Sequence, residues 1–152
     1  MTLAEALMER AELKAKISAV SERIEDNILV QDNEAPGEDP KELLPELTAS
    51  IQRLRVLISQ INKTNCCTLI DGESLTDLIA RRDCLLLEIS SYRDFTETSR
   101  RSTDRARGSE IKIRPCIEVK KLQKRLDDLS KDLRELEVKL QKANWNTELI
   151  EA

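Results

Sequence analysis

The chain of 152 residues contains no histidine and only three glycines, and aromatic side chains make up 2% of it. The absence of histidine excludes every catalytic triad that depends on this residue and removes the commonest general base. The sequence also lacks a phosphate-binding glycine loop and the H-E-x-x-H zinc motif. Its many carboxylates fall on helical patterns, where they are typical of a solvated face. We therefore expect a protein that is not an enzyme.

Long apolar runs are missing as well. No window approaches the roughly 20 consecutive apolar residues that a membrane-spanning helix needs. The first residues, MTLAEALMERAELK, lack the apolar segment of a secretion signal. We expect no membrane span, a cytoplasmic location and a single helical domain over residues 1–152. The sequence indicates no cofactor, no metal and no small-molecule substrate.

Charged residues make up 36% of the chain, a share typical of long amphipathic helices. Thr2 predicts the start of a first helix that ends near residues 27–30. Asp39 followed by Pro40 predicts a second start, because proline is favoured in the first helical position. Ser74 predicts a third start, and a last helix follows Pro115. The second helix has apolar residues at alternating steps of three and four: Leu44, Leu47, Ile51, Leu54, Ile58 and Ile61.

These patterns predict a mainly α fold, with long antiparallel helices forming a four-helix bundle or helical hairpins. Short β segments are expected near residues 28–30, 68–70 and 110–114, with a turn at Asp71-Gly72. The polar sequence NKTN at 62–65 interrupts the second apolar seam. The third helix should bury a broad face that includes Leu86 and Phe95.

The last helix has the most regular seam, with apolar residues from Val119 to Leu140 at alternating steps of three and four. Such narrow stripes suit contact with further helices, so we expect a homo-oligomer. Trp145, the only tryptophan, is an anchor in a neighbouring subunit or a cap over its own helix ends. The expected subunit contact comprises Leu126, Leu129, Leu133, Leu136, Leu140 and Trp145.

Basic residues gather in the segment 93–114, whose net charge is +3, whereas residues 1–50 have a net charge of −7. The two could attract each other between subunits, or the basic segment could bind an anionic partner, since guanidinium groups suit phosphate oxygens. The lack of interleaved aromatic residues disfavours base stacking. The candidate anion or nucleic-acid site comprises Arg100, Arg101, Arg105, Arg107, Lys112 and Arg114.

The adjacent cysteines Cys66 and Cys67 raise the question of a metal or redox site. Zinc sites usually present cysteine pairs as C-x₂-C, which this pair is not, and a disulfide between neighbours strains the peptide that joins them. We interpret them as ordinary thiols.

Several motifs in fixed order resemble the septicolysin-like family of uncharacterised bacterial helical proteins. They are LAEALMERAELKAKI, ILVQDNEAPGEDPKELL, INKTNCCT, LTDLIARRD, RARGSEIKI and LQKRLDDLSKDLRELEVKLQKANWNTEL. The resemblance covers nearly the whole chain and implies a mainly helical, cytoplasmic, self-associating protein with no catalytic residues to carry over. The family label itself implies a cytolysin.

Three hypotheses about function follow. The first is a non-enzymatic homo-oligomeric scaffold or interaction protein. The second is a phosphate or nucleic-acid binder that uses the arginine-rich segment 100–114. The third is the cytolysin that the family label suggests.

Overall fold

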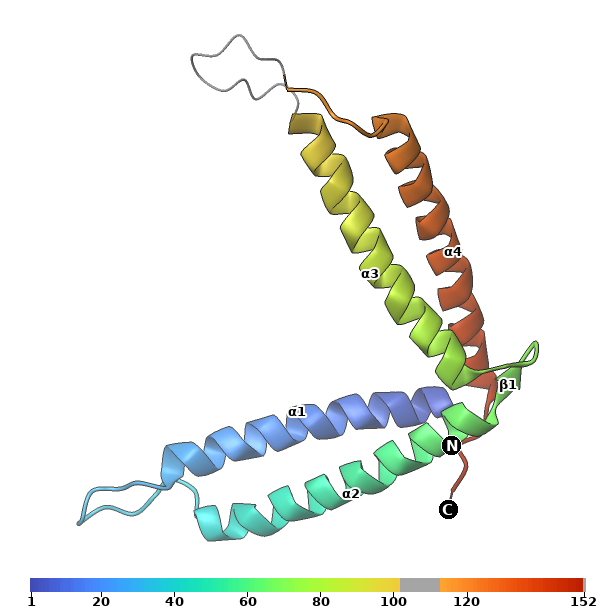
Figure 1. Ribbon diagram of the computed structural model, residues 1–152. Helices are drawn as coiled ribbons and strands as arrows, with labels where there is room; N and C mark the ends of the chain where they lie inside the picture. Colours follow the sequence, from blue (N-terminus) through green and yellow to red (C-terminus); the bar gives the residue numbers. More distant parts are fainter. Residues whose placement is uncertain (102–112, 152) are drawn as a thin grey trace, which may run out of the picture. The chain divides into compact units, whose positions relative to one another are not determined.

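The structure is a computed structural model that describes residues 1–101 and 113–151. It is mainly α-helical, with four α-helices and a two-stranded antiparallel sheet in the part described (Figure 1). This confirms the predicted fold class. The chain divides into two compact units, residues 1–74 with 143–152, and residues 75–142. The single domain stays a prediction.

Helix α1, Leu3–Asn27, begins and ends where the sequence predicts. Thr2 and Glu5 form a capping box at its start. The Thr2 hydroxyl accepts from the Glu5 amide at 3.3 Å, and the Glu5 carboxylate accepts from the Thr2 amide at 2.7 Å. This box satisfies amides that have no partner within the helix. The hydrogen bond from the Thr2 amide lowers the pKa of Glu5 below its ordinary value.

Helix α2, Pro40–Cys67, is capped by Asp39, whose carboxylate accepts from the Lys41 amide at 2.9 Å. The polar segment 62–65 lies within α2, and it places a polar residue in the apolar seam without ending the helix. Thr64 is fully buried there and its hydroxyl donates to the Gln60 carbonyl at 2.8 Å. A threonine that hydrogen-bonds one turn back keeps a buried polar group satisfied without breaking the helix.

The first unit is an antiparallel hairpin of α1 and α2, which lie side by side in Figure 1. Val20, Ile24 and Leu43 form a buried cluster, against which the partly buried Leu47 packs. Half of the predicted α2 seam does not face α1, since Leu44, Ile51 and Ile58 are exposed. The seam that faces inward includes Ser50 and Thr64, which a search for apolar residues passes over. Its members are Leu43, Leu47, Ser50, Leu54, Leu57, Ile61 and Thr64.

A tight hairpin follows α2. Strand β1, Leu69–Ile70, pairs with β2, Glu73–Ser74, around Asp71 and Gly72, which have φ values of 54° and 88°. Positive φ at both central residues is the geometry of a type I′ turn, so the predicted turn and the segment near 68–70 are confirmed. The predicted β segment at 28–30 is wrong, since these residues are loop. Residues 113–114 are not strand either, and 110–112 lie outside the described residues.

In the first unit, residues 147–149 lie beside residues 1–3 and are hydrogen-bonded to them. The Leu3 amide donates to the Thr147 carbonyl at 2.8 Å, and the Leu149 amide donates to the Met1 carbonyl at 2.9 Å. The Ile150 amide donates to the Thr64 hydroxyl at 2.9 Å. Thr64 therefore joins α2 to the end of the chain through one buried oxygen.

The second unit pairs α3, Leu75–Arg100, with α4, Val119–Asn146, whose last four residues belong to the first unit. The seam predicted for α4 is confirmed, with Leu129 and Leu136 only 1% and 3% exposed. The face predicted for α3 is partly wrong: Leu86 and Phe95 are exposed, while Thr96 is buried. Steps of three and four residues from Ile89 through Tyr92 lead to position 96 rather than 95 as the next buried position. The Thr96 hydroxyl donates to the Tyr92 carbonyl at 2.8 Å, so its burial leaves no unpaired polar group. Among the helices described, none is long and apolar enough to cross a membrane.

Candidate interaction surfaces

The arginine-rich segment lies only partly within the described residues. Arg100 donates to the Gln123 side chain of α4 at 3.1 Å, and Arg101 donates to Glu97 at 3.3 Å, so both are already engaged within the chain. Arg114 is exposed and forms no ion pair with any residue that the structure describes. The other three members of the predicted site, Arg105, Arg107 and Lys112, lie outside the described residues.

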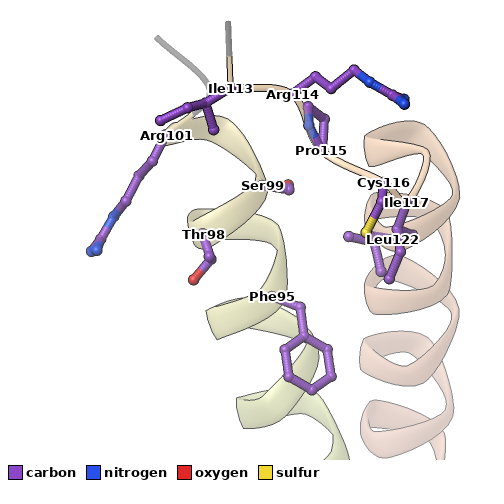
Figure 2. A pocket seen from close by; sticks show the side chains of 10 residues that line it. All are labelled: Phe95, Thr98, Ser99, Arg101, Ile113, Arg114, Pro115, Cys116, Ile117 and Leu122. Atoms are coloured by element: carbon purple, nitrogen blue, oxygen red, sulfur yellow. The ribbon is translucent and has the colours of Figure 1, made fainter. Parts of the chain in front are cut away.

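An apolar pocket lies at this end of the second unit, between α3 and the segment 113–117, and has a volume of about 560 Å³. Its wall is formed by Phe95, Ile113 and Ile117, each about half exposed. Figure 2 shows Arg101 and Arg114 at the margin of this wall, with their guanidinium groups directed away from it. The pocket thus combines an apolar surface with positive charge at its rim. Thr98, Ser99, Pro115, Cys116 and Leu122 complete the lining.

A second apolar surface runs along α2. We call Leu44, Ile51 and Ile58 the α2 stripe; these side chains are 49%, 47% and 36% exposed. A spacing of seven residues places them on one side of the helix over about 21 Å. The neighbouring positions on that side carry two positive charges, Lys41 and Arg55, and no carboxylate. The others are Pro45, Thr48, Gln52, Ser59 and Asn62.

The opposite edge of the α1–α2 hairpin is charged. Arg53 of α2 donates to Glu9 of α1 at 2.6 and 2.7 Å, and Lys16 pairs with Glu46 at 2.9 Å. Residues two apart on a helix point about 160° apart, so Arg53 and Ile51 face opposite sides. The hydrogen bonds from Arg53 lower the pKa of Glu9. Ion pairs therefore close one edge of the hairpin, while the other carries the α2 stripe.

The predicted subunit contact on α4 consists mostly of side chains that the chain itself covers. Leu129, Leu136 and Leu140 are 5% exposed or less, and Leu126 and Leu133 are partly buried. Trp145 differs, because 54% of it is exposed. A contact through the leucines would require the chain to uncover them, whereas Trp145 is accessible as it stands.

The four cysteines, Cys66, Cys67, Cys84 and Cys116, form no disulfide and are exposed. Cys66 and Cys67 end α2, so the sequence CC is the corner between that helix and the β hairpin. Among the described residues, no group of three or more cysteines and carboxylates could hold a metal ion.

Two exposed apolar surfaces were missed from the sequence. The α2 stripe was not separated from the residues that face α1 but placed with them in one seam, and Ile28, Leu29 and Val30 were assigned to a strand. The absence of carboxylates around the α2 stripe was a readable signal for the first. The second had no signal that distinguishes a buried strand from an exposed apolar loop.

Comparison with known proteins places the chain among relatives whose role is not known. Residues 10–149 match the profile of a family of unknown function, DUF6847. The chain belongs to this family. A crystal structure of a functionally unknown conserved protein from Corynebacterium diphtheriae is 35% identical, with a TM-score of 0.92 over 99% of each chain. None of the curated proteins matches the chain.

Membership of DUF6847 corrects the resemblance drawn from the sequence. The profile covers 140 residues and points to DUF6847, and the similar crystal structure is of a protein of unknown function. The septicolysin-like assignment is therefore wrong.

Proposed function

We propose that this DUF6847 protein is a non-enzymatic interaction protein that self-associates through the α2 stripe and acts as a helical scaffold. One observation carries the proposal. Leu44, Ile51 and Ile58 are accessible on an edge of a hairpin whose core is built from other residues. That edge has no carboxylate, and its charged residues are Lys41 and Arg55. Depletion of charge around exposed apolar side chains is the compositional mark of an interface core.

The spacing of the α2 stripe supports a second copy as the partner. Leu44 and Ile58 lie seven residues before and after Ile51. A two-fold axis at Ile51 would pair Ile51 with itself and Leu44 with Ile58 of the partner subunit, which is the self-complementary pattern of an isologous contact.

The position of Arg55 is compatible with this pairing. In the antiparallel arrangement Arg55 lies opposite a residue four positions before the axis, near Thr48 of the partner subunit. The two copies of Arg55 are then separated by about eight residues along the paired helices, or roughly 12 Å, beyond the screening length at physiological salt. Like charges do not oppose the contact.

The experiment compares the wild type with Ile51→Asp and Val56→Asp by sedimentation or light scattering at micromolar concentration. Val56 is 42% exposed on the same helix but points about 140° away from Ile51, so it is a matched control. We expect Ile51→Asp to lower the average mass and Val56→Asp to leave it unchanged. A wild type that stays at 17.4 kDa at every concentration would exclude the proposal.

A further inference from the structure

The loop between α1 and α2 exposes three consecutive apolar side chains. Ile28, Leu29 and Val30 are 64%, 86% and 50% exposed, and Leu29 is the most exposed of the large hydrophobic side chains in the described part of the chain. Isolated apolar side chains on a surface are ordinary, but three consecutive ones form an apolar patch that suits contact with a partner. We call Ile28, Leu29 and Val30 the tip of the loop.

Hydrogen bonds hold the two ends of this loop together. Asn27 donates to the Arg23 carbonyl at 2.8 Å and accepts from the Glu38 amide at 3.1 Å, so its side chain spans the two ends of the loop. Arg23 also forms an ion pair with Glu38, and the Nε–Oε2 distance is 2.8 Å. This hydrogen bonding lowers the pKa of Glu38. A loop with fixed ends loses less conformational freedom when its tip binds.

The loop is acidic as well as apolar. Residues 28–39 contain four carboxylates and no lysine or arginine. Glu38 pairs with Arg23 and Asp39 caps α2, but the side chains of Asp32 and Glu34 form no ion pair with any residue in the described ranges. The tip thus has an apolar trio followed by two carboxylates that are available to a partner.

The pocket of the second unit has the complementary features. Phe95, Ile113 and Ile117 give it an apolar wall, and Arg114 at its rim has no ion-pair partner among the described residues (Figure 2). Its volume of about 560 Å³ falls within the range of about 300–1,000 Å³ that is usual for occupied pockets. The apolar wall of the pocket is complementary to the apolar tip of the loop, and the positive charge of Arg114 is complementary to the carboxylates of Asp32 and Glu34.

We infer that the tip Ile28-Leu29-Val30 of one copy inserts into the pocket lined by Phe95, Ile113 and Ile117 of a second copy. Arg114 then lies beside the acidic residues Asp32 and Glu34 of the inserted loop. The inference rests on the proposed function in so far as both require self-association, but it uses different surfaces. Because tip and pocket are different surfaces, each copy can give its tip to one copy and its pocket to another, which produces an open chain or a ring, or two copies can exchange tips in a closed pair.

The test uses full-length chains that carry Ile51→Asp, so that the α2 stripe no longer contributes. This parent should still associate as its concentration rises, and more weakly at high salt, since screened charges take part. Adding Leu29→Ser or Ile117→Ser should weaken association by about tenfold or more, because each removes an apolar side chain from the contact. Val138→Ser, at a side chain that is 55% exposed on α4, is the matched control and should change nothing.

A mixing experiment identifies the contact as heterologous. The Leu29→Ser chain keeps an intact pocket and the Ile117→Ser chain keeps an intact tip. At a concentration where neither chain associates alone, a 1:1 mixture should therefore form a pair. A parent that remains monomeric, or a mixture that does not pair, overturns the inference. Either result leaves the α2 stripe untouched, since that contact is judged on the effect of Ile51→Asp in the wild type.

Cross-linking gives a second readout that does not depend on affinity. Cys116 lines the pocket, so Leu29→Cys in a chain with serine at 66, 67 and 84 places one thiol on the tip and one in the pocket. Oxidation with diamide should produce disulfide-linked dimers or a ladder of longer linked chains on a denaturing gel, and Cys116→Ser should abolish every product that joins tip to pocket. Absence of these products in correctly folded protein counts against the inference.

Discussion

Arg53 and Glu9 join α2 to α1 through two parallel hydrogen bonds, Nε to Oε1 at 2.6 Å and Nη2 to Oε2 at 2.7 Å. This fork-to-fork geometry fixes the two helices along one edge of the hairpin. Ile51, two residues before Arg53, faces the other edge and is 47% exposed. The same stretch of α2 therefore stabilises the hairpin on one side and offers an apolar surface on the other.

The Glu9–Arg53 pair should make the stability of the hairpin depend on pH. The pKa of Glu9 is lowered in the folded state, so its contribution is present above the ordinary value of about 4.3 and is lost as pH falls through the lowered pKa. Since the pair is partly exposed, Glu9→Gln should cost only about 0.5 kcal/mol at pH 7. At pH 3 this cost should shrink. Thermal unfolding followed by circular dichroism measures both.

The control for this pH effect is Glu12→Gln, on the same helix. Glu12 is exposed and forms no ion pair within the described part of the chain. Its replacement should leave the unfolding temperature unchanged at both pH values. An equal cost of Glu9→Gln at pH 7 and pH 3 would contradict the conclusion that ionised Glu9 stabilises the hairpin through Arg53.

Thr64 should be the most sensitive polar position in the first unit. It is fully buried, donates to the Gln60 carbonyl and accepts from the Ile150 amide. Thr64→Val keeps the shape but leaves the Ile150 amide without its acceptor, at an expected cost of about 1–3 kcal/mol. Hydrogen exchange should show faster exchange at the amides of residues 149 and 150.

Thr64→Ser separates the hydrogen bonds from the packing. Serine keeps the hydroxyl and loses one methyl group, so the amides near Ile150 should stay protected, with a loss of stability of about 1 kcal/mol. If serine and valine released the C-terminal segment equally, the hydroxyl would not be what holds it.

The four cysteines should all react in the folded protein. Each cysteine is exposed and none forms a disulfide. A thiol reagent such as dithionitrobenzoate should therefore titrate about four thiols without denaturant. Excess zinc should not slow the reaction, because the described residues offer no cluster of metal ligands. Protection of Cys66 and Cys67 by zinc would show that the pair does bind metal.

Local sequence signals predicted the ends of the helices well. Thr2, Asp39-Pro40 and Asp71-Gly72 act through their own backbone and nearest neighbours, so each could be recognised without knowledge of the fold. The seam of α4 was equally clear, because every one of its inward positions from Val119 to Leu140 is apolar.

The α2 seam could not be predicted from apolar periodicity alone. Two overlapping stripes share Leu47, Leu54 and Ile61, and which one turns inward depends on α1. The stripe that turns inward contains Ser50 and Thr64, whose burial is favourable only if their hydroxyl groups find hydrogen-bond partners. The α2 stripe and the loop tip are accordingly properties of the packing, and both emerged only with the structure.

Leu129 should report on whether the α4 seam is used within one chain. It is 1% exposed, and Leu129→Ala should lower the free energy of unfolding by about 2–5 kcal/mol through lost burial and the cavity that remains. Val138→Ala, at an exposed position of the same helix, should change it by no more than about 0.5 kcal/mol. If one chain buries Leu129, its cost will be the same at low and high protein concentration in denaturant titrations. A cost that grew with concentration would mean that a second copy covers this leucine, and the predicted subunit contact on α4 would then replace the α2 stripe.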